Sequence, residues 1–198
     1  TPMRLTVQSF ERNFLSTDDR AKEKLKEFSQ SLIQQIDVMS SIASAFSDFA
    51  KMPIQKKEQI EIISVIKFAL DIFTEQYRTY HPSEKKLYAN LDKTQLIRIV
   101  TNLLKNAIQA TENIENPIID VTVLSKEKNL IISVVDNGKG ISDDLKDLIF
   151  EPKFTTKTSG MGLGLAITKN IIEAYNGSIS FTSKEGKGTV FTVVLPKE

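Results

Sequence analysis

Apolar side chains recur at alternating steps of three and four across residues 17–52, a stretch without Gly or Pro that Gln35 alone interrupts. Such heptad spacing predicts one long helix, capped by Thr17 or Asp18 and ended by Pro53. The apolar positions of this heptad stripe are Leu25, Phe28, Leu32, Met39, Ile42, Phe46 and Phe49.

A stripe this narrow cannot be buried by its own helix. We expect it to pack on a shorter helix that carries Val7, Phe10 and Phe14, and on a second copy of the chain. Residues 1–52 are therefore predicted to be a helical hairpin that forms half of a dimeric four-helix bundle. The alternative is a hairpin docked on the chain's own globular domain.

From residue 58 onward the chain shows short segments of two kinds, some with the three-to-four spacing of helices and some with the alternation of strands. Spacing of three to four predicts helices over residues 61–72, 93–111 and 163–175, the second of them capped by Asp92. Alternation predicts strands over residues 86–90, 118–124 and 130–135, and a closing hairpin of residues 178–183 and 189–195. Because helices and strands mix without strict alternation, residues 53–198 are predicted to be an α+β sandwich, one mixed sheet with helices on one face.

Composition narrows the classes of function. A net charge of +1, without a long block of like charge, gives no reason to expect a nucleic-acid partner. The absence of Cys excludes disulfides, thiolate metal sites and a Cys nucleophile, and it favours the cytoplasm. No apolar run approaches the roughly 20 residues that cross a bilayer, so no membrane contact by this chain is expected. A parent protein anchored in an inner membrane is compatible with this.

Four short segments carry the candidate chemistry of the second domain. They combine paired asparagines, an acidic residue at a strand end, a Phe- and Lys-containing stretch, and alternating glycines. In chain order they are Asn102-Leu-Leu-Lys-Asn106, Asp136-Asn-Gly138-Lys-Gly140, Phe150-Glu-Pro-Lys-Phe154-Thr-Thr-Lys157 and Thr158-Ser-Gly-Met-Gly-Leu-Gly-Leu-Ala-Ile167.

The first two segments suit a purine nucleotide and its metal ion. The carboxylate of Asp136 can accept the exocyclic amine of adenine, and Gly138 and Gly140 let the backbone pass close to the base. Asn106 offers a neutral oxygen for Mg²⁺ beside a triphosphate. Asn102, four residues earlier, lies on the same helix face.

The last two segments suit phosphate groups. Gly160, Gly162 and Gly164 free backbone N–H groups at the positive end of a helix, and Lys157 supplies a point charge. Lys105 and Lys153 are weaker candidates. Each segment alone also fits a structural role: an exposed helix face, a hairpin turn, a linker, or, for Phe150 and Phe154, packing anchors.

The order and spacing of these segments resemble the N, G1, F and G2 boxes of the GHKL ATPases, and most closely the ATP-binding domain of two-component histidine kinases. The resemblance implies ATP and Mg²⁺ as ligands, Asn106 as the metal ligand, and a mobile lid over about residues 142–159. The nucleotide contacts that it implies are Asn102, Asn106, Asp136, Gly138, Gly140, Lys157, Gly160, Gly162, Leu163 and Gly164.

The hydrolytic members of this superfamily carry a Glu base four residues before the metal-binding Asn. Here that position is Asn102, and an amide cannot take up a proton at neutral pH, which favours a kinase over a hydrolase. The single histidine, His81, precedes a proline and is expected in a loop or edge strand without a special task. The start, TPMRLTVQSFERNF, resembles the segment after the acceptor-His motif of NtrY-like kinases, so we expect the acceptor to precede Thr1 and assign no catalytic residue.

The leading hypothesis is therefore the catalytic and partial dimerisation region of a sensor histidine kinase. Its parent would move the γ-phosphate of Mg-ATP to a His and then to an Asp of a response regulator, with a homodimer formed through the hairpin. Two alternatives stay open: a serine kinase of the anti-sigma type, and a dimeric nucleotide-sensing scaffold without transfer.

Overall fold

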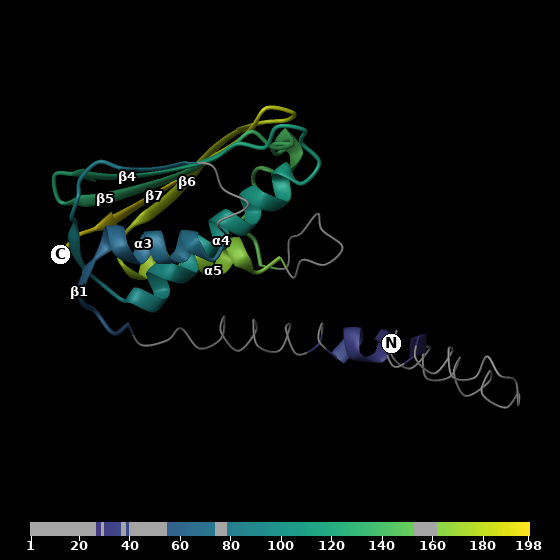
Figure 1. The fold of residues 1–198 in the computed structure, drawn as a ribbon, viewed down its shortest axis with the longest axis horizontal. Helices are drawn as coiled ribbons and strands as arrows, with labels where there is room; N and C mark the ends of the chain where they lie inside the picture. The colour runs from purple at the N-terminus through teal and green to yellow at the C-terminus, as the bar shows by residue number, and fades with distance from the viewer. Residues whose placement is uncertain (1–26, 29, 37–38, 40–54, 74–78, 153–161) are drawn as a thin grey trace, which may run out of the picture. The chain divides into compact units, whose positions relative to one another are not determined.

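The computed structural model describes residues 27–28, 30–36, 39, 55–73, 79–152 and 162–198 (Figure 1). The chain divides into two compact units, Thr1–Lys51 and Met52–Glu198. In the first unit the described residues are helical, and Ile33, Ile36 and Met39 expose more than half of their surface. The caps and most of the heptad stripe lie outside the described residues, so the hairpin and the dimeric bundle stay predictions.

The second unit is built on a five-stranded mixed sheet with the order β2-β4-β5-β7-β6. Strands β2 and β4 run parallel, and every other neighbouring pair is antiparallel. The strands are β2 (Thr79–Pro82), β4 (Ile119–Lys126), β5 (Asn129–Asp136), β6 (Ser178–Lys184) and β7 (Gly188–Pro196).

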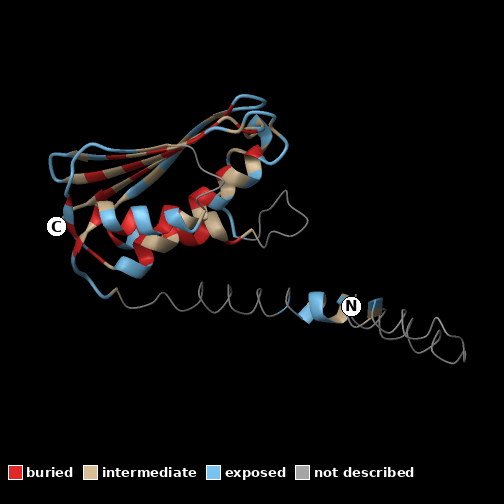
Figure 2. Cartoon of the chain, viewed as in Figure 1, coloured by how far each residue is buried: buried red, intermediate tan, exposed pale blue. Residues whose placement is uncertain are grey.

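Three helices cover one face of this sheet: α3 (Ile62–Asp71), α4 (Lys93–Thr111) and α5 (Gly164–Ala174) (Figure 1). Burial alternates along the central strands, so that Val121, Ile132 and Val193 are closed off from solvent (Figure 2). Their apolar side chains form the core with the inward stripes of the helices. The predicted α+β sandwich is confirmed. In the described part of the chain, no helix has the length and apolarity needed to cross a membrane.

Acidic side chains fix the starts of two helices. The Asp92 Oδ1 atom accepts hydrogen bonds from the backbone N–H groups of Thr94 (2.8 Å) and Gln95 (3.1 Å), which confirms the predicted cap of α4. Glu61 caps α3 in the same way. Each carboxylate satisfies N–H groups that have no partner within the helix, and its charge suits the positive end of the helix.

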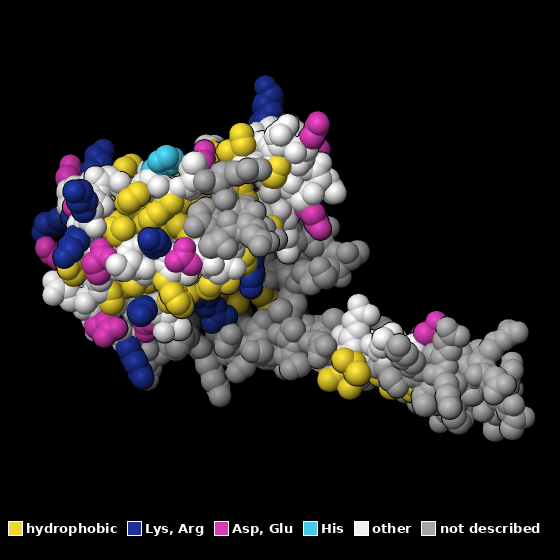
Figure 3. Space-filling view, in the orientation of Figure 1, with side chains coloured by type: hydrophobic (Ala, Val, Ile, Leu, Met, Phe, Trp, Pro, Cys, Tyr) yellow, Lys and Arg dark blue, Asp and Glu magenta, His cyan; other side chains and the backbone are white. Residues whose placement is uncertain are grey.

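Two differences from the expected elements concern short strands. The predicted strand 86–90 is β3 (Tyr88–Leu91), which pairs with β1 (Glu58–Glu61) in a separate two-stranded sheet. His81 lies in β2, the edge strand of the main sheet, and is exposed (Figure 3), which agrees with the expected loop or edge strand. β1 and β2 were not predicted, although β3 of the same length was, because a run of four residues shows its period only weakly.

Candidate functional site

One face of α4 organises the candidate site. Asn102, Asn106 and Ala110 are spaced four residues apart, so they share a face of the helix, and all three are half-buried. Over these eight residues the helix rises about 12 Å, the scale of one extended nucleotide. The Asn102 end contacts the start of α5, and the Ala110 end contacts the loop after β5.

The loop after β5 is docked on the Ala110 end. The backbone N–H of Lys139 donates to the Ala110 carbonyl oxygen at 3.0 Å. A Cβ atom on Gly138 would lie 2.5 Å from that same oxygen, well inside contact distance. Only glycine therefore lets the loop approach α4 this closely.

Asp136 ends β5 beside this loop and is 6% exposed. Burial raises the pKa of its carboxyl group, while hydrogen bonds from the backbone N–H groups of Gly138 (2.9 Å) and Thr189 pull the pKa down in part. A carboxylate has about four acceptor positions, and these two bonds leave room for a further donor. The Asp136 carboxylate, which is predicted to recognise adenine, is thus buried, held in place and able to accept one more hydrogen bond.

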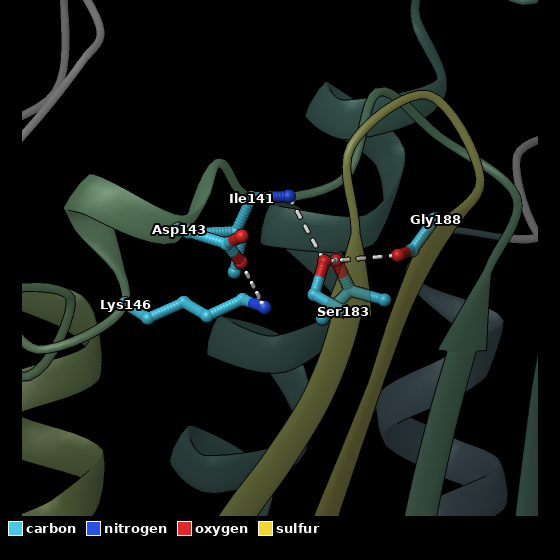
Figure 4. Close-up of polar contacts among 6 residues, drawn as sticks. Ile141, Asp143, Lys146, Ser183 and Gly188 are labelled. Carbon is cyan, nitrogen blue, oxygen red and sulfur yellow. Dashed lines mark hydrogen bonds and ion pairs between the residues drawn. The ribbon is translucent and has the colours of Figure 1, made fainter.

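A hydroxyl network holds the other side of this loop (Figure 4). Ser183 on β6 accepts from the Ile141 N–H and donates to the Gly188 carbonyl oxygen, each at 2.9 Å. Because the single proton of Ser183 goes to that carbonyl, the Thr189 hydroxyl, 2.9 Å away, must be the donor in its bond with Ser183. Thr189 and Ser183 were not predicted as site residues, because only strand register brings Thr189 opposite Asp136 and Ser183 opposite Thr189.

At the other end of the face, Asn102 ties α4 to α5. Its Nδ2 atom donates to the Gly164 carbonyl oxygen (3.3 Å) and to Thr168 Oγ1 (3.2 Å). Gly164 is the first residue of α5, and Gly162 just before it has a φ of 63°. Leu163 between them is buried in the core, so its contribution to a ligand site would come from its backbone.

The Phe-containing segment packs against the sheet and α5. The Phe150 ring meets Phe181 edge to face at 5.9 Å, and Lys169 Nζ lies 5.7 Å from the centre of the Phe150 ring. Lys146 and Asp143 form an ion pair of 2.6 Å in the preceding turn (Figure 4). Phe150 therefore has the packing role considered for it. Lys153, Phe154, Lys157 and Gly160 lie outside the described residues.

The donor set suits a Mg²⁺ ion that accompanies a triphosphate. Within the ranges that the structure describes, no three His, Cys, Asp or Glu residues gather into a metal site. Mg²⁺ usually keeps several waters and takes few protein ligands beside phosphate oxygens. One neutral amide such as Asn106 fits that habit.

Comparison with known proteins now defines the class. The profile of the family described as histidine kinase-, DNA gyrase B-, and HSP90-like ATPase matches residues 91–198, from the last residue of β3 to the end of the chain. The chain belongs to this family. Its second unit is accordingly an ATP-binding domain, and the match covers every part of the candidate site described above.

Individual relatives place it among sensor kinases. The sensor histidine kinase ZraS of Escherichia coli (strain K12) is 32% identical over 177 residues, covering 86% of this chain and 37% of ZraS. A putative NtrY-like sensor histidine kinase of Rickettsia felis is 27% identical over 197 residues, covering 98% of this chain and 33% of that protein. The chain thus spans about a third of the length of these relatives.

A solved structure agrees with the fold. The catalytic domain of the histidine kinase ThkA superposes with a TM-score of 0.65 at 32% identity, covering 72% of this chain and 96% of that domain. The resemblance to the ATP-binding domain of histidine kinases is therefore confirmed as a family relationship.

Proposed function

We propose that residues 52–198 bind Mg-ATP as the catalytic core of a sensor histidine kinase. The observation that carries this proposal is the shared face of α4, which joins the Asp136 loop at Ala110 to the start of α5 at Asn102. A nucleotide laid along this face would have its base at the carboxylate and its phosphates at the glycines.

Each residue then has a defined task. Asp136 accepts the exocyclic amine of adenine, which guanine lacks at that position. Gly162 and Gly164, with Gly160 and Lys157, bind the phosphates through backbone N–H groups, the helix dipole and a positive charge. Asn106 holds Mg²⁺, whose charge offsets that of the phosphate oxygens. Gly138 lets the loop after Asp136 dock on α4, and Gly140 lets it pass close to the Lys184 carbonyl, so both glycines would act by placing this loop beside the base.

The proposed reaction is phosphoryl transfer to a histidine. An imidazole nitrogen attacks the γ-phosphorus, the bond from that phosphorus to the β–γ bridging oxygen breaks, and ADP leaves. Asn102 cannot act as a base toward water, so hydrolysis is disfavoured. In the parent protein the phosphoryl group would pass on to an Asp of a response regulator.

Calorimetric titration tests the site. Asp136→Asn should lower the affinities for ATP and ADP alike, because both nucleotides carry the adenine amine. Asn106→Ala should remove the dependence of ATP affinity on Mg²⁺ and leave binding in EDTA unchanged. Exposed Lys93→Ala on the same helix is the matched control. Unaltered titrations for both site variants would refute the assignment.

A transfer assay tests the reaction. With γ-labelled ATP, the chain should label a separately supplied histidine-containing helical bundle, and the label should be lost in acid. Acid-stable label on a Ser-containing protein would support the serine-kinase alternative. ATP binding without transfer to any acceptor would support the nucleotide-sensing scaffold.

A further inference from the structure

Thr168 is a polar residue in a buried part of α5. Its neighbours on the inward face, Ile167, Ile171 and Ile172, are buried aliphatic residues. Thr168 is 0% exposed like them, although its side chain is polar. Its hydroxyl donates to the Gly164 carbonyl oxygen at 2.8 Å. A buried hydroxyl needs such partners, because leaving it unsatisfied is costly.

This bond determines the orientation of the Asn102 amide. The proton of Thr168 is given to a carbonyl, so Thr168 Oγ1 can only accept from Asn102. The Gly164 carbonyl oxygen is likewise an acceptor. Both contacts therefore require the amide nitrogen of Asn102 to face α5. Chemistry thus assigns the nitrogen and oxygen of this amide, which are often hard to tell apart.

The amide oxygen of Asn102 takes part in neither of these two hydrogen bonds. Asn102 Oδ1 lies 4.0 Å from the point where a Cβ atom on Gly164 would stand, next to the end of the glycine stretch. An oxygen there cannot donate a hydrogen bond to a phosphate. It can accept from water or interact with a cation.

We propose that Thr168 is a positioning residue that holds Asn102 with its oxygen toward the triphosphate and its nitrogen against the first turn of α5. The proposal rests on the proposed placement of the phosphates beside Gly164. In this arrangement Asn102 accepts a hydrogen bond from metal-bound water and does not donate one to a phosphate. The orientation of its amide is set by Thr168, a residue on another helix.

The test compares Thr168→Val, which removes only the hydroxyl, with Thr168→Ser, which keeps it. Because the two hydrogen bonds of Asn102 are long, we expect Thr168→Val to lower the affinity for Mg-ATP only about three- to tenfold. Adenosine affinity should be unchanged, since Asp136 is untouched. Thr168→Ser should restore Mg-ATP affinity. ATP affinity in EDTA should differ little between the variants, because the amide oxygen of Asn102 cannot form a hydrogen bond with phosphate oxygens when no metal ion is present.

Equal Mg-ATP affinities of wild type and Thr168→Val would overturn the proposal. Parallel losses for ATP and adenosine would do the same, because they would show general damage to the fold. If the wild type itself bound no ATP, or if Asp136→Asn had no effect, the proposed function would fail first and this inference with it.

A measurement on the wild type covers the case in which Thr168→Val does not fold. Nuclear magnetic resonance of the side-chain amide of Asn102 should show protons protected from exchange with solvent before any ligand is added. Free rotation and fast exchange of that amide would contradict the proposed orientation.

Discussion

Asp136 and Thr189 lie directly opposite each other on β5 and β7, and the backbone N–H of Thr189 donates to the Asp136 carboxylate. The two residues are 6% and 5% exposed. A carboxylate held in so little solvent is favourable as an adenine acceptor but costs stability when it is charged.

The first prediction concerns this cost. Because burial raises the folded-state pKa of Asp136 above the ordinary 3.8, the folded protein binds the proton more tightly than the unfolded chain. Stability is then lost as the pH rises through the folded pKa, and none of this loss is present below 3.8. The amide side chain in the Asp136→Asn variant does not titrate, so the variant does not share this loss. Its free energy of unfolding minus that of the wild type should therefore increase as the pH rises from 3.8 through the folded pKa of Asp136.

Urea denaturation at a series of pH values, without nucleotide, measures the difference. The exposed Asp144→Asn serves as the control for the removal of a carboxylate charge. A difference for Asp136→Asn that decreases with rising pH would mean that hydrogen bonding outweighs burial at this carboxyl group.

The second prediction separates close contact from backbone conformation at two glycines. A Cβ atom on Gly138 meets the Ala110 carbonyl oxygen at 2.5 Å, whereas one on Gly186 meets nothing within 4 Å but sits at a φ of 70°. We expect Gly138→Ala to destabilise the fold by about 1–3 kcal/mol and to displace the loop from α4. Gly186→Ala should cost about 1 kcal/mol and leave ATP binding intact.

Thermal or urea unfolding gives the two costs, and calorimetry gives the affinities. If both variants bound ATP as the wild type does, the docking of the Gly138 loop on α4 would not matter for the site.

Local signals in the sequence predicted much of this architecture. The Asp92 cap, the extent of α4 and the β6–β7 hairpin depend on residues close together in the chain, so their patterns can be read directly. The candidate site was predicted because its segments match a known order. The contact between Asn102 and the start of α5 shows two of those segments side by side.

Long-range pairing was not predictable. The strand at β3 was predicted, but its partner β1 lies about thirty residues earlier in the chain, and nothing in the sequence links the two four-residue segments. Thr189 reaches Asp136 only through strand register, which a one-residue slip would change. Thr168 did leave a signal: it is a polar residue at a position where the helical period calls for an apolar one.

The third prediction tests the heptad stripe. Met39 belongs to the stripe and exposes 59% of its surface within its own chain. Met39→Lys should therefore leave the chain folded but weaken its self-association about tenfold or more, since a dimer would have to bury the charge. Gln34→Lys, at an exposed position off the stripe, is the matched control. Sedimentation that finds the wild type monomeric at tens of micromolar would contradict the dimeric bundle.

The last prediction is that this chain binds ATP without phosphorylating itself. His81 pairs in register with Thr122, and Thr122 pairs with Ser133. Side chains in register share a face of the sheet, and Ser133 points away from the face of buried Ile132, Val134 and Asp136. His81 therefore lies on the face of the sheet that the helices leave open, opposite the proposed nucleotide site.

In-line transfer needs the acceptor nitrogen about 3 Å from the γ-phosphorus, which a residue across the sheet cannot reach. Incubation with γ-labelled ATP and Mg²⁺ should leave both the wild type and His81→Gln without acid-labile label, although both bind ATP equally. A histidine-containing helical bundle added to either protein should then become labelled to the same extent. Label on the wild-type chain that disappears in His81→Gln would show that His81 is an acceptor and that the sheet does not separate it from the nucleotide.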